Sequence, residues 1–565
     1  MTCKIILFVN KMAATANEYG IKLLKYITKE KKDVTNIYFY AILNGLVSLS
    51  IPLGIQSIIS FVMGATMVTS IYLLIFFVVL GTFFVGHFRL KVLQIIEKIQ
   101  QKIFVEFSVA FTEKLPKVDL SSSRKYYLPE LVNRFFDVQN LQKGISKILL
   151  EIPTALIQIF FGILLLSFYH VWFLAFGGLV VLSVAVIFRY TMESGIKSSI
   201  EESDKKYDTA AWIEDIAGSV KTFKMHSENE THLQGTDERV LEYLDHRTSH
   251  FKVLMFQYKT IIAFKVIITL VMLVIGTYLM LDQQLNIGAF IATEIVVLSI
   301  MAAVEKLIIS LESYYDIIAS YAKLTKVTEL KEESDGDIEL FQKSHGTEVE
   351  LKDVNFAFQD ASPILNDLNF KIKSNSLNVV TGNTGAGKSL LLNMLAGFYE
   401  PASGAILFDK IPLKNLNKQL FRSQVGLYLE NMKVIQGTVL ENILLGNSSS
   451  DTESILKVSE KIGIENISHL FSNGFYTDIS ETDSEITFSS RKKILLLRTL
   501  LGDKRLILLE NPMAGMPEEF QQKLLQYLHE VKERATVVIV SSDQNLTAGA
   551  DQHLHLDNGT LSIIS

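Results

Sequence analysis

The stretch TGNTGAGKSLL, residues 381–391, decides the fold of the C-terminal part of the chain. It follows the apolar run LNVVT and precedes SLLLNMLAGFY, which has the composition of a helix. This order of strand, glycine-rich turn with Lys-Ser, and helix is that of a P-loop. Glycines let backbone N–H groups approach phosphate oxygens, and the helix N-terminus adds its dipole. The stretch therefore predicts an α/β domain that holds a nucleotide.

The residues of this loop have separate expected roles. Lys388 is expected to place a cation on the β/γ-phosphates, and Ser389 to offer its hydroxyl to Mg²⁺. ATP and Mg²⁺ are therefore the expected cofactors. The predicted nucleotide-binding set from this stretch is Gly382, Asn383, Thr384, Gly385, Ala386, Gly387, Lys388, Ser389 and Leu390.

The sequence around the loop alternates strands with helices. Short apolar runs such as GAILFD, RLILLE and ATVVIVSS are separated by helical stretches, which predicts a mostly parallel central sheet. The polar stretch KEESDGDIELFQKSHGTE precedes them and reads as a linker. The predicted domains are an N-terminal segment 1–33, a membrane domain 34–325, a linker 326–347 and a nucleotide-binding domain 348–565.

The first part of the chain has the composition of a membrane protein. Hydrophobic residues make up 49% of the chain and the mean hydropathy is +0.28. Residues 34–88 and 152–188 contain no Asp, Glu, Lys or Arg, and a membrane helix needs only about 20 residues. The sequence predicts six membrane spans, at about 35–63, 71–93, 146–168, 171–192, 259–281 and 286–310.

The distribution of positive charge predicts the orientation. The connections GATMVTS, YHVW and DQQLN carry no Lys or Arg, whereas 22–32, 89–145 and 189–259 carry many. Because positive residues favour the cytoplasmic side, both termini are expected in the cytoplasm of an integral plasma (inner) membrane protein in contact with lipid. The net charge of −6 gives no indication of a nucleic-acid partner. Cys3, the single cysteine, excludes an internal disulfide.

With six spans and one P-loop domain, the chain resembles a half-transporter of the ATP-binding-cassette (ABC) exporters. LKDVNFAFQDASPILNDLNFKI resembles the opening strands of the family's cassette, and TVVIVSSDQNLTAGADQHLHLDNGTL resembles its last strand, switch region and closing hairpin. The resemblance implies a type 1 exporter bundle, adenine stacking on Phe358, and a second half-transporter chain as partner in a homodimer or heterodimer. The sequence style is similar to exporters of peptides and proteins, which implies such a cargo or an export apparatus as a further partner.

The chain departs from the family pattern after the strand RLILLE. The family has Asp, which holds the Mg²⁺ shell, and then Glu, which acts on the attacking water; here the residues are Glu510 and Asn511. Glu510 keeps a carboxylate, but the Asn511 amide cannot take a proton. The family's glutamine that senses Mg²⁺ is matched by Glu430. Glu510 and Glu430 are therefore the candidate substitute catalytic residues, and with Ser389 the candidate metal ligands.

Other family positions are changed as well. The signature segment, Leu-Ser-Gly-Gly-Gln in the family, aligns with ITFSS, in which Phe488 and Ser489 replace both glycines and Thr487 keeps a hydroxyl. Side chains there are expected to obstruct backbone approach to a facing γ-phosphate. Ser542 takes the place of the switch histidine, and Pro517 replaces the aspartate that follows the Asp-Glu pair.

The chain keeps the family's nucleotide-binding residues and lacks several residues that act after binding. Three hypotheses follow. The first, which the sequence favours, is a transporter subunit that binds ATP and cycles slowly or with a partner's help. The second is a non-transporting membrane protein in which ATP binding regulates or stabilises an assembly. The third is an active exporter that uses Glu510 or Glu430 as its base.

Three further sets of charged or histidine residues lie outside the predicted nucleotide site. Glu294 lies inside the sixth predicted span. It either faces a translocation path or is paired or protonated at a bundle interface. The basic run 491–493 favours a solvated helix face. His553 and His555 alternate on a short strand without a third ligand, which favours surface residues over a metal site.

Overall fold

The computed structural model describes residues 18–564, apart from 24, 65–68, 125, 227–229, 341–344, 359–361, 448–449, 465–470, 481–485 and 542–543. The chain divides into two compact units. One comprises Met1–Lys117 with Lys125–Leu330, and the other comprises Val118–Arg124 with Lys331–Ser565. The predicted boundaries at 34, 326 and 348 stay predictions beside this division.

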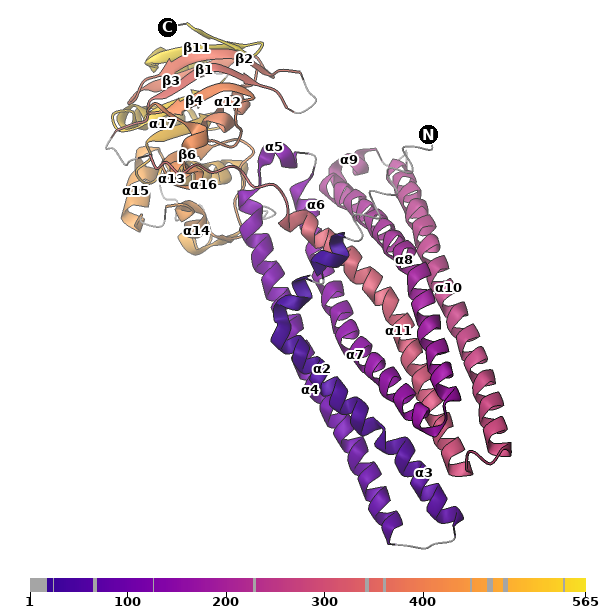
Figure 1. Ribbon diagram of the computed structural model, residues 1–565. Helices are drawn as coiled ribbons and strands as arrows, with labels where there is room; N and C mark the ends of the chain where they lie inside the picture. The colour runs from indigo at the N-terminus through magenta and orange to yellow at the C-terminus, as the bar shows by residue number, and fades with distance from the viewer. Residues whose placement is uncertain are drawn as a thin grey trace. The chain divides into compact units, whose positions relative to one another are not determined.

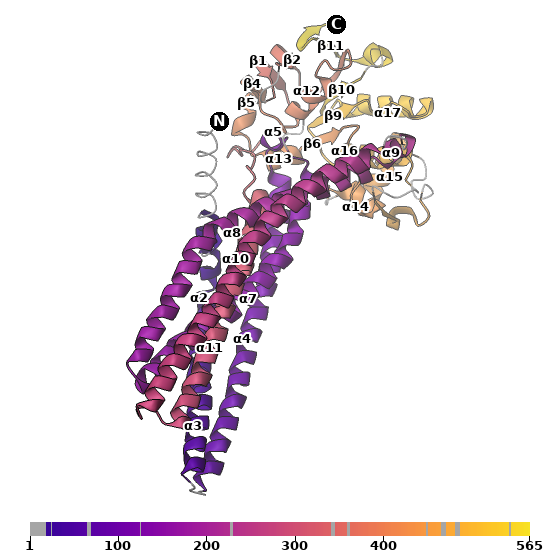
Figure 2. The same ribbon diagram turned by 90° about the vertical axis from the view of Figure 1, so that its right-hand side faces the viewer.

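The first unit contains the predicted six spans. Within the described residues, six helical segments are long and apolar enough to cross a membrane, which confirms the prediction: Glu18–Met63, Ser70–Lys117, Leu128–Tyr169, Trp172–Gly218, Thr231–Leu281 and Ile287–Thr328. All are longer than a bilayer requires, because helical structure continues past the uncharged stretches into charged sequence. The long helices run side by side in both views (Figures 1 and 2).

The elements of this unit are almost all helical. They are η1 (Thr28–Glu30), α2 (Lys31–Ser48), α3 (Ser50–Met63), α4 (Ser70–Lys114), η2 (Leu115–Lys117), α6 (Leu128–Val132), η3 (Asn133–Phe136), α7 (Asp137–Tyr169), α8 (Trp172–Gly218), α9 (Val220–Met225), α10 (Thr231–Leu281) and α11 (Ile287–Thr328). The first span is divided at Leu49 into α2 and α3, because Pro52 has no N–H to donate to the preceding turn.

α11 is the most buried helix of the membrane unit, and α7 and α8 pack closely against it. A Cβ at Gly144 on α7 would lie 2.3 Å from Cγ1 of Ile317, and one at Gly195 on α8 would lie 2.3 Å from the ring of Tyr315. Both distances are shorter than any real contact, so glycine is required for these helices to approach α11. The core of the unit is therefore built around α11.

The second unit is an α/β domain with a mostly parallel main sheet, as predicted, and it has two further sheets. The largest sheet has the strand order β12-β11-β3-β10-β9-β6, in which all neighbours are parallel except β12. An antiparallel sheet has the order β2-β1-β4-β5, and β7 pairs with β8. The strands are β1 (Val349–Phe356), β2 (Leu365–Ile372), β3 (Leu377–Gly382), β4 (Ser403–Phe408), β5 (Ile411–Pro412), β6 (Val425–Tyr428), β7 (Gly437–Thr438), β8 (Asp478–Ile479), β9 (Leu506–Glu510), β10 (Thr536–Val540), β11 (Gln552–Asp557) and β12 (Thr560–Ile563).

Helices cover the large sheet, whose central strands are buried along their whole length. The helices of this unit are α5 (Leu120–Ser123), α12 (Lys388–Leu395), η5 (Leu413–Asn415), α13 (Lys418–Ser423), α14 (Val439–Leu444), α15 (Thr452–Lys461), η7 (Gly474–Tyr476), α16 (Phe488–Leu500), α17 (Glu518–Val531) and η8 (Gln544–Gly549).

Strand register places the predicted site at one edge of the large sheet. Val540 on the central strand β10 pairs with Val380 on one side and with Glu510 on the other. The carboxyl ends of β3 and β9 therefore lie together, and ligands of open α/β sheets bind at this edge. The loop after β3 and the residues after β9 meet there.

Candidate nucleotide-binding site

The loop between β3 and α12 has the backbone geometry of a phosphate-binding turn. Gly382, Gly385 and Gly387 have φ values of +150°, +85° and +99°. A Cβ at Gly382 would lie 2.0 Å from the carbonyl oxygen of Leu556, whereas one at Gly385 would meet no atom within 4 Å. Gly382 is thus required by the fold, while Gly385 leaves open space where a ligand can approach the backbone.

Lys388 closes this loop on itself. Its Nζ donates to the carbonyl oxygens of Gly382 and Asn383, each at 2.8 Å. The ammonium group therefore lies over the loop at the first residue of α12, where the helix dipole also favours an anion. Positive charge and free N–H groups at one helix start are what a polyphosphate requires.

An oxygen-rich pair lies beside the loop. The Ser389 hydroxyl donates to one carboxylate oxygen of Glu510, and the backbone N–H of Glu430 donates to the other at 3.1 Å. Glu510 is 9% exposed, whereas the Glu430 side chain is exposed. Mg²⁺ is usually bound by one or two carboxylates together with substrate phosphates. The Ser389 and Glu510 oxygens fit this ion, and only the backbone of Glu430 reaches the pair.

Asn511, at the predicted base position, is fixed through its backbone. Its N–H donates to the carbonyl oxygen of Val540 at 2.8 Å, and its φ is +43°, a conformation that Asn tolerates better than most residues. Its own carbonyl oxygen accepts from Nζ of Lys492 at 2.8 Å, and Ala514 accepts from the same group at 2.7 Å. The Asn511 amide can donate and accept hydrogen bonds but cannot carry a proton away from water.

The interpretation of 491–493 as a solvated face is wrong for Lys492. This side chain is 2% exposed, and burial lowers the pKa of Lys492 to about 8. Its ammonium group fastens α16 to the turn after β9 by the two carbonyl contacts. The apolar run that follows predicts a buried helix face, but nothing local predicts that a lysine joins it.

The signature segment forms the start of α16. The Thr487 hydroxyl accepts from the Ser490 N–H at 3.1 Å and caps the helix. Phe488, the first helical residue, is 60% exposed, and the Ser489 hydroxyl lies 3.7 Å from Sδ of Met516. An aromatic side chain thus projects from the position where the family has its first glycine.

Phe358, the predicted adenine platform, lies just after β1 and is half-buried. It packs edge-to-face against Phe356 and Tyr399, with ring centroids 4.9 and 5.8 Å away. The guanidinium of Arg124 lies 3.6 Å from the Phe358 centroid. Adenine would have to replace Arg124 or use the opposite face. Sequence reasoning missed Arg124, because it lies far from Phe358 along the chain.

The other residues singled out in the sequence are Ser542, Pro517, His553 and His555. Ser542 lies outside the described residues, and Pro517 immediately precedes α17. His553 Nε2 and His555 Nδ1 lie 2.9 and 3.1 Å from the hydroxyl of Thr381. In the part of the chain that the structure describes, no group of three or more His, Cys, Asp or Glu residues is placed to hold a metal ion.

Acidic residues of the membrane unit are mostly paired. Glu305 lies 2.7 Å from Lys265, and Glu151 lies 3.6 Å from Lys306. Glu294 is exposed on α11, and the described residues offer it no hydrogen-bond or ion-pair partner. The structural-pairing alternative is thus unsupported within this chain, and a role on a translocation path stays a prediction.

Fold and site together define a class: an integral membrane protein of six spans with a P-loop domain, as in ATP-dependent membrane transporters. Two family models match the chain. The ABC transporter transmembrane region matches residues 34–304, and the ABC transporter domain, a nucleotide-binding domain, matches residues 365–514. The chain belongs to the ABC transporters and has the organisation of a half-transporter.

Three relatives match part of the chain at low sequence identity. The chain is 25% identical over 295 residues to the uncharacterized ABC transporter ATP-binding protein YknV of Bacillus subtilis, covering 52% of this chain and 48% of the relative. It is 24% identical to the beta-(1→2)glucan export ATP-binding/permease protein NdvA of Agrobacterium vitis, covering 52% and 50%, and 27% identical to the ATP-dependent lipid A-core flippase of Alcanivorax borkumensis, covering 43% and 42%. The chain thus spans about half the length of these relatives.

A solved structure shares the whole fold. The structure of a bacterial Atm1-family ABC exporter with ATP bound matches with a TM-score of 0.81 at 16% identity, covering 94% of both chains. This likeness confirms the six-helix exporter fold with its nucleotide-binding domain.

Proposed function

We propose that this chain is an exporter subunit that binds ATP with Mg²⁺ at residues 382–389 and hydrolyses it slowly or only with a partner's help. The observation that carries the proposal is the contrast between Glu510 and Asn511. Glu510 is buried against the Ser389 hydroxyl beside the P-loop, whereas the next residue carries an amide where a base is needed. Loss of a general base typically costs about 10²–10⁴ in rate.

The chain's own residues divide the work of binding. Lys388 turns from the carbonyl oxygens of Gly382 and Asn383 toward phosphate oxygens, and backbone N–H groups at the start of α12 donate to them. Ser389 and Glu510 would hold Mg²⁺, which would supply positive charge beside the phosphates. The Glu430 N–H keeps the Glu510 carboxylate in place.

A second half-transporter chain would complete the assembly, as a homodimer or a heterodimer. In such an assembly the segment 487–490 of one chain faces the nucleotide of the other. Phe488 is exposed in that segment and has a side chain where close backbone approach needs none. Both nucleotide sites of a dimer containing this chain are therefore incomplete.

The two other hypotheses keep specific support. A regulatory subunit that only binds ATP would have the same nucleotide site. It would differ from the proposed exporter subunit because it would transport no cargo. A substitute base is harder to accommodate at Glu510, because both of its carboxylate oxygens already accept hydrogen bonds from the Ser389 hydroxyl and the Glu430 N–H. Glu430 is exposed and is the better candidate of the two.

The cargo and the location complete the proposal. Peptide or protein cargo remains the prediction from sequence style, and the names of two relatives give a glucan and lipid A-core as competing classes. A plasma (inner) membrane position with both termini in the cytoplasm follows from the basic stretches 22–32, 89–145 and 189–259.

The testing experiment measures steady-state ATPase rate and ATP affinity on one preparation of the full chain in lipid nanodiscs, with Lys388→Ala as baseline. We expect ATP binding that depends on Lys388 and a rate close to that of the variant. Fast turnover that disappears in Lys388→Ala would contradict the proposal. Glu430→Gln and Glu510→Gln would then show which carboxylate acts as the base.

A further inference from the structure

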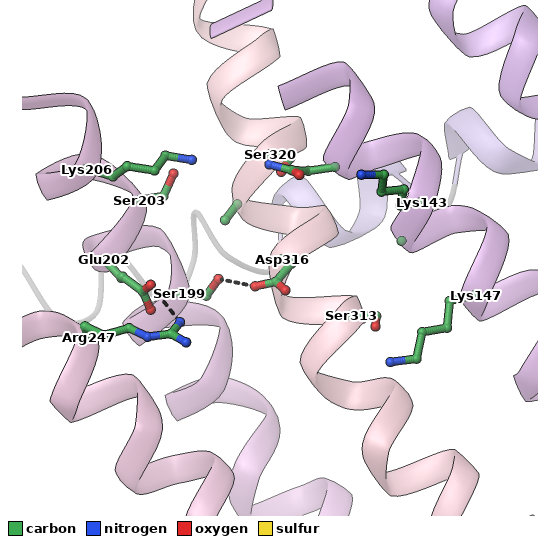
Figure 3. A pocket seen from close by; sticks show the side chains of 13 residues that line it. Lys143, Lys147, Ser199, Glu202, Ser203, Lys206, Arg247, Ser313, Asp316 and Ser320 are labelled. Atoms are coloured by element: carbon green, nitrogen blue, oxygen red, sulfur yellow. Dashed lines mark hydrogen bonds and ion pairs between the residues drawn. The ribbon is translucent and has the colours of Figure 1, made fainter. Parts of the chain in front are cut away.

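A polar pocket of about 370 Å³ lies among α7, α8, α10 and α11 of the membrane unit (Figure 3). The pocket lies at or beyond the ends of the predicted membrane spans. Its lining residues belong to the parts of each helix where charged residues reappear in the sequence. Serine hydroxyls line it from α8 and α11. Its charged lining residues are Lys143, Lys147, Lys206, Arg247, Glu202 and Asp316.

The acidic residues of the pocket are already engaged. Arg247 lies 2.9 Å from Glu202 in an ion pair, and the Ser199 hydroxyl donates to Asp316 at 3.3 Å. The two acidic residues therefore do not neutralise the three lysines of the pocket. The lining side chains, four basic and two acidic, therefore carry a net positive charge.

Two of the lysines have nothing to neutralise them. Lys143 and Lys147 make no ion pair or hydrogen bond within the part of the chain that the structure describes. Lys206 lies 3.4 Å from Asp137 and 4.8 Å from the centroid of the Tyr207 ring, and its side chain is 48% exposed. In Figure 3, Lys206 on α8 and Lys143 on α7 point toward each other across α11, and Lys147 lies farther along α7, beside Ser313.

The spacing of the two unpaired lysines makes the arrangement slightly unfavourable without a ligand. Residues four apart on a helix are neighbours, and like charges at this spacing destabilise it. An anion between the lysines removes this repulsion and gains charge-assisted hydrogen bonds. Serine hydroxyls, which are good donors to phosphate oxygens, lie around the same space.

We propose that this pocket binds a phosphomonoester, with Lys143, Lys147 and Lys206 as its cationic ligands. A volume of about 370 Å³ exceeds what one phosphate ion fills and lies in the range of small-molecule sites. The phosphate group has two potential sources. It belongs either to a soluble phosphorylated metabolite or to a lipid headgroup, since Lys147 lies at the predicted end of the third span, where headgroups gather.

Binding is tested on the full chain in nanodiscs, with Lys388→Ala in every sample so that the P-loop contributes nothing. One arm adds glycerol 3-phosphate to phosphatidylcholine discs, and the other compares discs with and without phosphatidic acid. The readouts are calorimetric affinity and the shift in thermal unfolding. We expect binding in at least one arm, and that arm identifies the source.

Two variants and one control decide the outcome. Lys143→Gln with Lys147→Gln should weaken binding roughly tenfold or more, since both charge-assisted hydrogen bonds to the phosphate are lost. Asp316→Asn, which removes a repelling charge, should tighten it. Lys252→Gln, an exposed lysine of α10 outside the pocket, should leave affinity unchanged. No binding in either arm, undiminished binding in the double variant, or unchanged affinity in Asp316→Asn would overturn the proposal.

Discussion

The two halves of the nucleotide site differ in what holds them together. The loop 382–389 is ordered by its own residues, through Lys388 and the glycines. The turn after β9 is ordered from outside, because Lys492 of α16 holds its carbonyl groups and β10 holds the Asn511 N–H. The phosphate-binding half thus depends mainly on neighbouring residues, with Gly382 against Leu556 and Ser389 on Glu510 as its distant contacts, so it can persist while the half that activates water diverges.

The largest expected effect comes from restoring a carboxylate at residue 511. Asn511→Glu should raise the ATPase rate on the order of 10²-fold, because it adds a general base to an otherwise intact phosphate cradle. The steady-state rate in nanodiscs measures this. Asn511→Gln is the matched control, since it has the same length and cannot accept a proton. Equal rates in the two variants would show that the signature segment, not the base, limits turnover.

Alanine at two glycines separates the folding role of the loop from its binding role. Gly382→Ala should lower the free energy of unfolding by about 3 kcal/mol, since its Cβ meets a backbone carbonyl. Gly385→Ala meets no neighbour and should cost only about 1 kcal/mol for its positive φ. Its main effect should be weaker ATP binding. Thermal unfolding and calorimetric ATP affinity, measured on both variants, check this; similar stability losses would contradict the assignment.

A smaller effect is expected at Phe358. Phe358→Ala should weaken ATP binding about tenfold, because base–aromatic stacking contributes about 1–3 kcal/mol. Arg124→Gln should strengthen binding a few-fold, since adenine no longer has to displace a cation from the ring. Competition with GTP, measured by calorimetry, reports on base recognition. Unchanged affinity in both variants would place adenine elsewhere.

The last effect, which is spread over several pH units, concerns the pH dependence of stability. Burial lowers the pKa of Lys492 to about 8 from 10.5, so between these values the unfolded chain holds a proton that the folded chain has lost. Stability relative to Lys492→Met should therefore rise with pH across this window, by at most about 1.4 kcal/mol per pH unit. Thermal unfolding of both proteins from pH 7 to 10 tests this, with Lys493→Met as control. A falling difference would contradict it.

Local sequence was sufficient to predict the fold and the phosphate-binding loop. The P-loop, the six spans and the parallel sheet follow from patterns of neighbouring residues, and the structure and comparisons confirm the fold. The break at Leu49 was not predicted. Pro52 indicates a break, but the apolar sequence continues on both sides of it. Lys492 could not be placed, because its burial depends on a turn that follows a different strand.

Contacts between distant segments were missed for the same reason. The pairing of Lys265 with Glu305 joins α10 to α11, and Arg124 meets Phe358 from another part of the chain. Charge and residue type alone do not identify such partners. The pocket lined by Lys143 and Lys147 likewise becomes visible only when four helices are brought together.

The most direct test of the central claim identifies the nucleotide that the chain retains. The purified full chain in nanodiscs is incubated with Mg²⁺ and radiolabelled ATP, separated from free nucleotide, and its bound nucleotide is identified by chromatography. We predict that intact ATP remains bound in wild type, is absent from Lys388→Ala, and is converted to ADP in Asn511→Glu. ADP as the main bound nucleotide of the wild-type chain would contradict the claim that this site holds ATP rather than cleaving it.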